Sequence, residues 1–170
     1  MTLRWTVRAE TPEDIPVVHA INVAAFDTPA EADLVDALRT DTEAWIDGLS
    51  IVGLDADGTL VAHVLLTRCY VDSTPALALA PVAVLPEHQG KGAGGAVIRA
   101  SLEAAMKRGE ALVLVLGHAD YYPRFGFEPA SRWGIRAPFS VPDEAMMALS
   151  LDSSRPMPSG VIHYASAFGV

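Results

Sequence analysis

Four glycines lie within residues 90–95, immediately before a segment whose apolar residues recur at helical spacing. The apolar run at residues 76–86 precedes them and predicts a buried strand. Backbone N–H groups at the start of a helix are unpaired and carry a partial positive charge, so they attract phosphate. Because glycine has no side chain, a ligand can come close to this backbone. The stretch therefore predicts a strand, a loop and a helix that together bind a phosphate-bearing molecule.

A dinucleotide-binding fingerprint is the first alternative for this loop. Gly90-x-Gly92-x-x-Gly95 has its spacing and lies between the predicted strand and the predicted helix. A dinucleotide fold normally opens with this unit, whereas here two helices and several strands are predicted ahead of it. The acidic residue expected about 20 positions later is missing, because position 115 is a valine. A P-loop is excluded because no Gly-Lys-Ser/Thr ends the run.

The loop also has the pattern Gln89-x-x-Gly92-x-Gly94, and Tyr122-x-x-x-Gly-Phe, ending at Phe127, follows the next apolar strand. With both motifs in this order, residues 3–127 resemble the GNAT superfamily of acetyl-CoA-dependent N-acyltransferases, in its stand-alone bacterial type. The resemblance implies that the pyrophosphate of coenzyme A lies on the loop N–H groups. It also implies that the pantetheine arm pairs with the main chain of the preceding strand. The implied cofactor-binding residues are Val82, Ala83, Val84, Gln89, Gly90, Lys91, Gly92, Ala93, Gly94 and Gly95.

The same resemblance assigns Tyr122 as the general acid. A phenol near the departing sulfur can donate a proton or a hydrogen bond to the coenzyme A thiolate. The alternative is that Tyr121 and Tyr122 are both core aromatic residues. The register with Gly126 and Phe127 favours Tyr122 as the functional one.

The sequence does not assign the general base to a single residue. An amine with a pKa near ~10 must lose a proton before it attacks a thioester. Some relatives place a carboxylate on the strand before the loop, but residues 77–85 hold no ionisable side chain here. Water that relays the proton to backbone carbonyls or to a more distant acid is the alternative. The relays in question are His118, which has the best predicted location, His63, Glu31 and Asp33.

No metal site is predicted. His118-x-Asp120 offers two ligands with no third nearby. Cys69 is the one cysteine, which excludes an internal disulfide and a multi-cysteine metal site. We expect Cys69 to be a small buried apolar residue.

The elements that position these residues follow from the periodicity of the chain. Alternation at residues 2–8 predicts a first strand. Thr11-Pro-Glu-Asp and Thr28-Pro-Ala-Glu each have the pattern of a capping box and predict two helices. Asp57-Gly58 predicts a hairpin turn between strands at residues 50–55 and 60–66.

The helix after the glycine loop is predicted to end at Gly109. Its apolar stripe would comprise Ile98, Leu102, Ala105 and Met106, and its outer face a ladder of Arg99, Glu103 and Lys107. Residues 111–116 predict a strand covered on both faces, parallel to the strand before the loop. One or two helical turns at residues 119–125 and two closing strands at 145–151 and 161–165 complete the pattern.

The predicted fold class is α/β, in the α+β sense, with a GNAT-like twisted mixed sheet of about seven strands and helices on both faces. We expect one domain over residues 1–170, with a motif-bearing core at 3–127 and C-terminal strands and loops at 128–170. The 170 residues are 51% hydrophobic and 19% charged, which is typical of a globular chain. No apolar stretch reaches the length of a membrane span and no signal core is present, which predicts a cytoplasmic protein.

The net charge of -9 disfavours binding to nucleic acid and to anionic membranes. The expected activity is acetyl transfer from acetyl-CoA to a primary amine of a small molecule or peptide, by direct attack in a ternary complex. Dimerisation would help to close the acceptor pocket. A non-catalytic acyl-CoA-binding sensor or partner module is the alternative, and a nicotinamide oxidoreductase is a third hypothesis. The acceptor itself stays open among polyamines, antibiotics, amino acids and protein amines.

Overall fold

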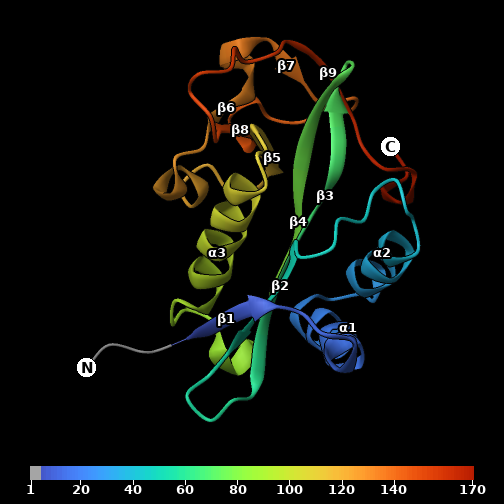
Figure 1. The fold of residues 1–170 in the computed structure, drawn as a ribbon, viewed down its shortest axis with the longest axis vertical. Helices are drawn as coiled ribbons and strands as arrows, with labels where there is room; N and C mark the ends of the chain where they lie inside the picture. The colour runs from blue at the N-terminus through green and yellow to red at the C-terminus, as the bar shows by residue number, and fades with distance from the viewer. Residues whose placement is uncertain (1–4) are drawn as a thin grey trace.

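Long strands form where the sequence is continuously apolar. In the computed structural model, which describes residues 5–170, β3 (Leu60–Val71) and β4 (Thr74–Val84) make a hairpin that runs along most of the molecule (Figure 1). Residues 72–75, predicted as a polar break, therefore include the tight turn of this hairpin. Asp72 adopts the left-handed conformation there, with φ of 50°. Its carboxylate accepts a hydrogen bond from the Val161 N–H at 3.0 Å, which ties the C-terminal segment to the turn.

The sheet is twisted and mixed, as predicted. In the described residues it has nine strands, and its main path runs β1, β2, β3, β4, β5, β8, β6. The strand β9 pairs with β3 and with β7. All pairs are antiparallel except β4 with β5 and β7 with β9. The remaining bounds are β1 (Thr6–Ala9), β2 (Ser50–Leu54), β5 (Leu112–Leu116), β6 (Glu128–Pro129), β7 (Ile135–Arg136), β8 (Met146–Ser150) and β9 (Gly160–His163).

Seven of these strands were predicted, and the two-residue strands β6 and β7 are additions. The strand predicted at residues 2–8 begins in the description at Thr6, and its first positions lie outside the described residues. The strands β3 and β4 both extend beyond their predicted ends towards Asp72. Parallel pairing of β5 with β4 is confirmed.

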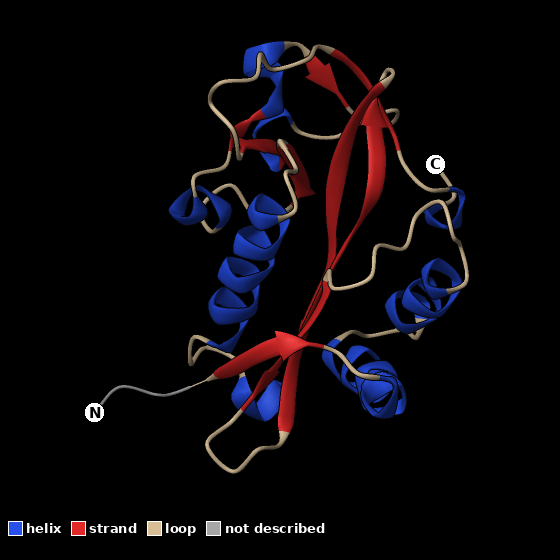
Figure 2. Cartoon of the chain, viewed as in Figure 1, coloured by secondary structure: helices blue, strands red, loops and turns tan. Residues whose placement is uncertain are grey.

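Helices cover both faces of the sheet, which confirms the predicted layers. The helices α1 (Ile15–Ala25) and α2 (Ala30–Arg39) lie on one side, and α3 (Ala93–Lys107) lies on the other (Figures 1 and 2). At the start of α1, the Asp14 carboxylate accepts hydrogen bonds from the Thr11 N–H at 2.7 Å and from Arg8 at 2.6 Å. The hydrogen bond from Arg8 holds the pKa of Asp14 at about 2. The Thr11 capping box is therefore confirmed, although a 3₁₀ turn at Pro12–Asp14 precedes the α-helix.

The second capping box was wrong. The helix α2 begins at Ala30 with Pro29 as its N-cap, so Thr28 lies one residue too early to cap it. Its hydroxyl instead accepts a hydrogen bond from the Ala30 N–H at 3.3 Å.

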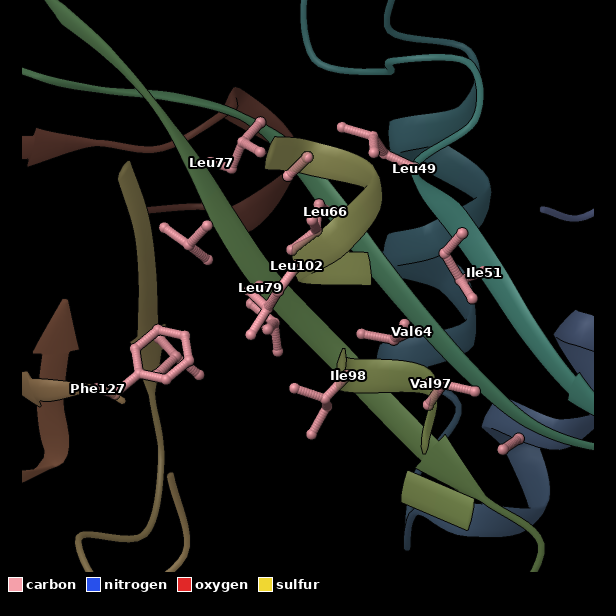
Figure 3. Packing of buried hydrophobic residues seen from close by; sticks show 14 of the residues in the cluster. Leu49, Ile51, Val64, Leu66, Leu77, Leu79, Val97, Ile98, Leu102 and Phe127 are labelled. Carbon is pink, nitrogen blue, oxygen red and sulfur yellow. The ribbon is translucent and has the colours of Figure 1, made fainter. Parts of the chain in front are cut away.

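The core between α3 and the sheet is built from aliphatic side chains. Val97, Ile98 and Leu102 belong to one buried cluster with Leu77 and Leu79 of β4 (Figure 3). The predicted stripe was wrong at Met106, which is 55% exposed, because the buried face of the helix runs through positions 97, 98, 101, 102 and 105.

The polar positions of α3 divide between the core and the surface. Ser101 is wholly buried, and its hydroxyl donates to the Ile98 carbonyl at 2.7 Å. On the outer face, Lys107 pairs with Glu103 at 3.0 Å, while Arg99 contacts an aromatic ring instead of extending this ladder.

A gap opens between β4 and β5 in the middle of the sheet. The two strands are paired only at Leu77 with Val113 and at Ala78 with Leu114. Next along β4 the register against β3 shifts, so that residues 80 and 81 lie opposite Leu65 alone. A bulge of this kind bends its strand, and Pro81 has no N–H for a ladder. Within the described residues, the edge of β4 beyond Ala78 therefore has no strand partner on the β5 side.

Candidate active site

The N-terminus of α3 has the geometry of an anion-binding turn. Gly92 is the N-cap, with φ of 96°, a conformation that favours glycine. The first helical hydrogen bond runs from the Ala96 N–H to the Gly92 carbonyl at 3.0 Å, so the earlier N–H groups of the helix have no partner in the described residues. No side chain caps the helix, and its first turn holds no acidic residue. The free N–H groups and the helix dipole therefore favour a phosphate here.

The loop before the helix is held in shape at both ends. The Gln89 side-chain amide donates to the Val84 carbonyl at 3.0 Å, which links the loop to the end of β4. The Trp5 indole N–H donates to the Lys91 carbonyl at 3.3 Å. The hydrogen bond of Gln89 explains the glutamine of the motif in structural terms, because this side chain fixes the loop against the strand.

A cavity of about 350 Å³ lies over this turn, and two arginines border it. The Arg99 guanidinium lies 4.9 Å from the centre of the Phe125 ring, and that of Arg124 lies 4.3 Å from the centre of the Tyr121 ring. Stacking on a ring orients each guanidinium. Arg124 also donates from Nε to the Tyr121 carbonyl at 2.8 Å, and N–H groups not bonded in this way can bind phosphate. The lining residues are Val84, His88, Gln89, Gly90, Gly92, Gly94, Gly95, Arg99, Tyr121, Arg124 and Phe125.

Six of the ten predicted cofactor residues line this cavity, namely Val84, Gln89, Gly90, Gly92, Gly94 and Gly95. Ala93 is buried towards the core, and Lys91 is exposed. Val82 and Ala83 lie further back on β4, opposite Val64 and His63 of β3. Gly94 and Gly95 belong to the first turn of α3 rather than to the loop.

Sequence reasoning missed both arginines. Arg99 was assigned to the outer ladder of α3, although it lies four residues after Gly95 and hence one turn along the same helix face. A Cβ atom on Gly95 would lie 3.1 Å from Nη1 of Arg99, which shows how closely the guanidinium approaches the first turn of α3.

Tyr122 lies at the start of a 3₁₀ turn, Tyr122–Phe125, that follows β5. Its ring packs edge-on against Tyr121 at 5.1 Å and against Phe127 at 5.8 Å between centroids. A Cβ atom on Gly117 would lie 2.3 Å from Cε2 of this ring, so the ring rests on the Gly117 backbone. Burial raises the pKa of Tyr122 to about 12, so its hydroxyl stays protonated near neutral pH. Among the described residues, no hydrogen bond occupies that hydroxyl.

The four proton relays suggested by the sequence lie in different environments. His118 is exposed, and its carbonyl accepts hydrogen bonds from the N–H groups of Tyr121 and Tyr122 at 3.1 Å and 3.3 Å. Glu31 is half-buried, and one of its carboxylate oxygens is buried without a hydrogen-bond partner in the described residues. Asp33 is exposed on α2.

His63 is wholly buried, with its two ring nitrogens 3.1 Å from Nδ2 of Asn22 and 2.9 Å from Oγ of Ser50. Since the Ser50 hydroxyl donates to Glu10, the ring must donate from Nε2 and accept at Nδ1. Burial, together with the charge of Arg39, lowers the pKa of His63 to about 3. This neutral, enclosed ring supports the packing of β2, β3 and α1.

A second cavity, of about 280 Å³, touches both strands of the gap from the side opposite α3. Ala78 and Leu114, which line it, belong to the apolar cluster formed with the C-terminal strands, whereas Leu77 faces α3. Leu116 also lines it, one residue before the Gly117 on which Tyr122 rests. The gap therefore has the cavity over the glycine turn at one end and a separate apolar cavity beside it.

A family model described as the acetyltransferase (GNAT) family matches residues 17–127, which include both sequence motifs. The chain belongs to this family. It is 40% identical over 145 residues to the uncharacterized N-acetyltransferase YjhQ of Escherichia coli K12, an alignment that covers 82% of this chain and 79% of the relative. It is 28% identical to the uncharacterized N-acetyltransferase YhbS of the same strain, over 95% of this chain and 97% of the relative.

Solved structures of family members have the same architecture. The crystal structure of Escherichia coli YhbS in complex with CoA superposes with a TM-score of 0.90 and 27% identity, covering 100% of this chain and 94% of that one. A GNAT acetyltransferase from Brucella melitensis in complex with acetyl-CoA gives a TM-score of 0.78 and 28% identity, covering 97% and 98%. The GNAT resemblance drawn from the two motifs is thus confirmed, and the protein is an acyltransferase.

Two further properties of the described residues concern membrane spans and metal sites. Within residues 5–170, no helix has the length and apolar character needed to cross a membrane. In the same residues, no group of three or more His, Cys, Asp or Glu side chains is placed to hold a metal ion.

Proposed function

We propose that the protein transfers an acetyl group from acetyl-CoA to a primary amine by direct attack in a ternary complex. The observation that carries this proposal is the gap between β4 and β5, which has the phosphate turn of α3 at one end and the apolar cavity beside it. The two solved relatives bind CoA and acetyl-CoA, and this chain has the matching fold. Acetyl-CoA supplies a thioester already activated for transfer, so the residues of the chain need only bind, orient and move protons.

The phosphate groups of the cosubstrate would lie on the free N–H groups of Gly92, Gly94 and Gly95. Arg99 and Arg124 would neutralise their charge from the rim of the cavity. This local arrangement explains how a chain with a net charge of -9 could hold a polyphosphate. The unpaired edge of β4, including Val82 and Val84, would hold the pantetheine amides by main-chain hydrogen bonds.

Tyr122 is the proposed general acid. When the amine attacks the thioester carbonyl carbon, the new C–N bond forms and the C–S bond breaks. The thiolate then takes the phenolic proton, and the tyrosinate regains a proton from solvent. A pKa of about 12 keeps this proton on Tyr122 throughout the neutral range. The ring is fixed by Gly117, Tyr121 and Phe127, so the hydroxyl has a defined position.

His118 is proposed as the relay that carries the amine proton to solvent. It directly follows Gly117 and belongs to the same turn as Tyr122, and its exposed ring can exchange protons with water. We expect His118→Gln to lower kcat at pH 7. An unchanged kcat would assign the proton transfer to water alone.

The decisive experiment measures release of free coenzyme A thiol from acetyl-CoA with a panel of amines. We expect Tyr122→Phe to lower kcat by about 10²-fold or more, with little change in KM for acetyl-CoA. Tyr121→Phe is the matched comparison, because it removes a neighbouring hydroxyl beside the cofactor cavity, so we expect any effect to fall on KM for acetyl-CoA rather than on kcat. Equal kcat values for Tyr122→Phe and the wild type would refute the acid role. Tight binding of acetyl-CoA without turnover of any amine would instead favour a non-catalytic acyl-CoA-binding module.

A further inference from the structure

The apolar cavity beside the gap is walled by aromatic rings from the C-terminal part of the chain. Phe139 and Tyr164 stack at 6.1 Å between centroids with 18° between their planes, and Phe168 lies 5.3 Å from Tyr164. The Tyr164 hydroxyl donates to the sulfur of Met146 at 3.7 Å, and burial raises its pKa to about 12. No charged side chain is among the residues that line the cavity. A bound molecule would therefore meet apolar surface on most sides.

A more polar hollow of about 390 Å³ lies next to it and shares Tyr164. Asp41, Glu43 and Arg68 line this hollow, so it offers partners to charged groups, but none of its lining residues belongs to β4 or β5. An amine bound there would be separated from the gap by the aromatic wall. Of these two hollows, only the apolar cavity touches both strands between which the thioester would lie.

From these observations we infer that the acceptor is a monoamine with an apolar body, either alkyl or aryl, which fills this cavity and presents its amine at the gap. The inference rests on the proposed acetyl transfer and names its substrate class. An apolar cavity of about 150 Å³ holds a benzene ring, so about 280 Å³ has room for a ring and a short aminoalkyl chain. A polyamine, an aminoglycoside or a lysine side chain in a peptide would bring further charged or polar groups into a cavity that has no charged side chain in its lining.

The same surroundings help the chemistry. Burial disfavours the charged form of an amine and lowers its pKa. An amine in this cavity would therefore lose its proton more readily, which is the step for which residues 77–85 supply no base. The apolar wall thus selects the acceptor and favours the neutral form that attacks.

The test compares amines that differ in one feature. Butylamine, pentylamine and hexylamine add one methylene each, and we expect kcat/KM to rise about threefold to fourfold per methylene until the cavity is filled. Diaminohexane has the length of hexylamine with a second amine at the far end. At pH 8 we expect its kcat/KM to be about 10²-fold lower, because the second amine, with a pKa near ~10.4, must enter uncharged. A diamine or a lysine peptide that outperforms hexylamine would overturn the inference.

A charge placed in the wall provides a second test. Phe139 lies on a loop and is only half-buried, so substitutions there should leave the fold intact. We expect Phe139→Asp to reverse the preference in favour of diaminohexane, while Phe139→Leu keeps the preference for hexylamine. The affinity for acetyl-CoA, whose phosphate groups would bind in the other cavity, should stay within about threefold of the wild-type value in both variants and reports their folding. If Phe139→Asp binds acetyl-CoA normally and still prefers hexylamine, the acceptor lies elsewhere.

Titration of hexylamine and diaminohexane into the CoA-loaded protein separates this inference from the proposed function. Failure of every amine to be acetylated refutes the acetyl transfer. If hexylamine binds more tightly than diaminohexane, the apolar acceptor cavity is still supported. If diaminohexane binds as tightly as hexylamine or more tightly, the acceptor cavity is refuted.

Discussion

Replacing Gly117 by alanine tests whether the position of Tyr122 controls the reaction. The backbone of Gly117 does not have a positive φ, so alanine can adopt its conformation without strain. The new methyl group, however, would lie 2.3 Å from Cε2 and 2.7 Å from Cδ2 of Tyr122. The Tyr122 ring would have to move by about 1 Å to restore van der Waals contact, and a misplacement of that size can lower a rate by about 10²-fold.

We therefore expect Gly117→Ala to reduce kcat by about 10²-fold while KM for acetyl-CoA stays within about threefold of wild type. The crowding should also lower the free energy of unfolding by about 1–2 kcal/mol, since overpacking is partly offset by the reduced entropy of the unfolded chain. Steady-state thiol release and denaturant unfolding measure the two effects.

Gly53→Ala is the matched control. Its methyl group would lie 2.9 Å from Cγ1 of Val97, so it also crowds the core, though less closely than at Gly117, and it does not touch Tyr122. We expect this variant to lose stability but to keep kcat within about threefold of wild type. In a Tyr122→Phe background, Gly117→Ala should cost less than about threefold further, because both changes remove the same proton donor. A folded Gly117→Ala enzyme with normal kcat would refute the positioning role of Gly117. So would a double variant whose loss of kcat equals the product of the losses in the two single variants.

Three further outcomes follow from the structure. Arg99→Ala should weaken acetyl-CoA binding about tenfold and make the affinity less dependent on salt than that of the wild type. Lys107→Ala, on the outer face of the same helix, should leave the affinity unchanged. Equal affinities of Arg99→Ala and the wild type in a direct titration would remove Arg99 from the cofactor site. Burial lowers the pKa of His63 to about 3, so between about pH 6.5 and 3 only the unfolded chain takes up a proton on this ring. The free energy of unfolding should therefore fall by about 1.4 kcal/mol per pH unit as the pH drops through this range. His63→Gln should remove that part of the slope in unfolding titrations, and an unchanged slope would show that His63 protonates in the folded state.

Much of the fold was readable because its signals are local. The glycine run, the Thr11 capping box and the Asp57-Gly58 turn depend on backbone conformations that neighbouring residues enforce on their own. The continuous apolar run of β5 predicted a doubly covered strand for the same reason, since no polar residue interrupts it. Predictions failed where a tertiary contact outweighed a local preference. Met106 has the right residue type for the core, but the sheet lies under other positions of α3.

The candidate site also has parts that depend on local sequence and parts that depend on tertiary contacts. The sequence by itself determined the phosphate turn and the Tyr122 motif, because both depend on glycines and spacings within a few residues. Only the tertiary structure placed Arg99 and Arg124 on the rim of the cofactor cavity. It brings the turn that holds Tyr121, Arg124 and Phe125 against the start of α3, where Arg99 stacks on Phe125. It alone brought Phe139 and Tyr164 against the open edge of β4 and β5 and enclosed His63, because burial depends on what the whole chain packs around a residue.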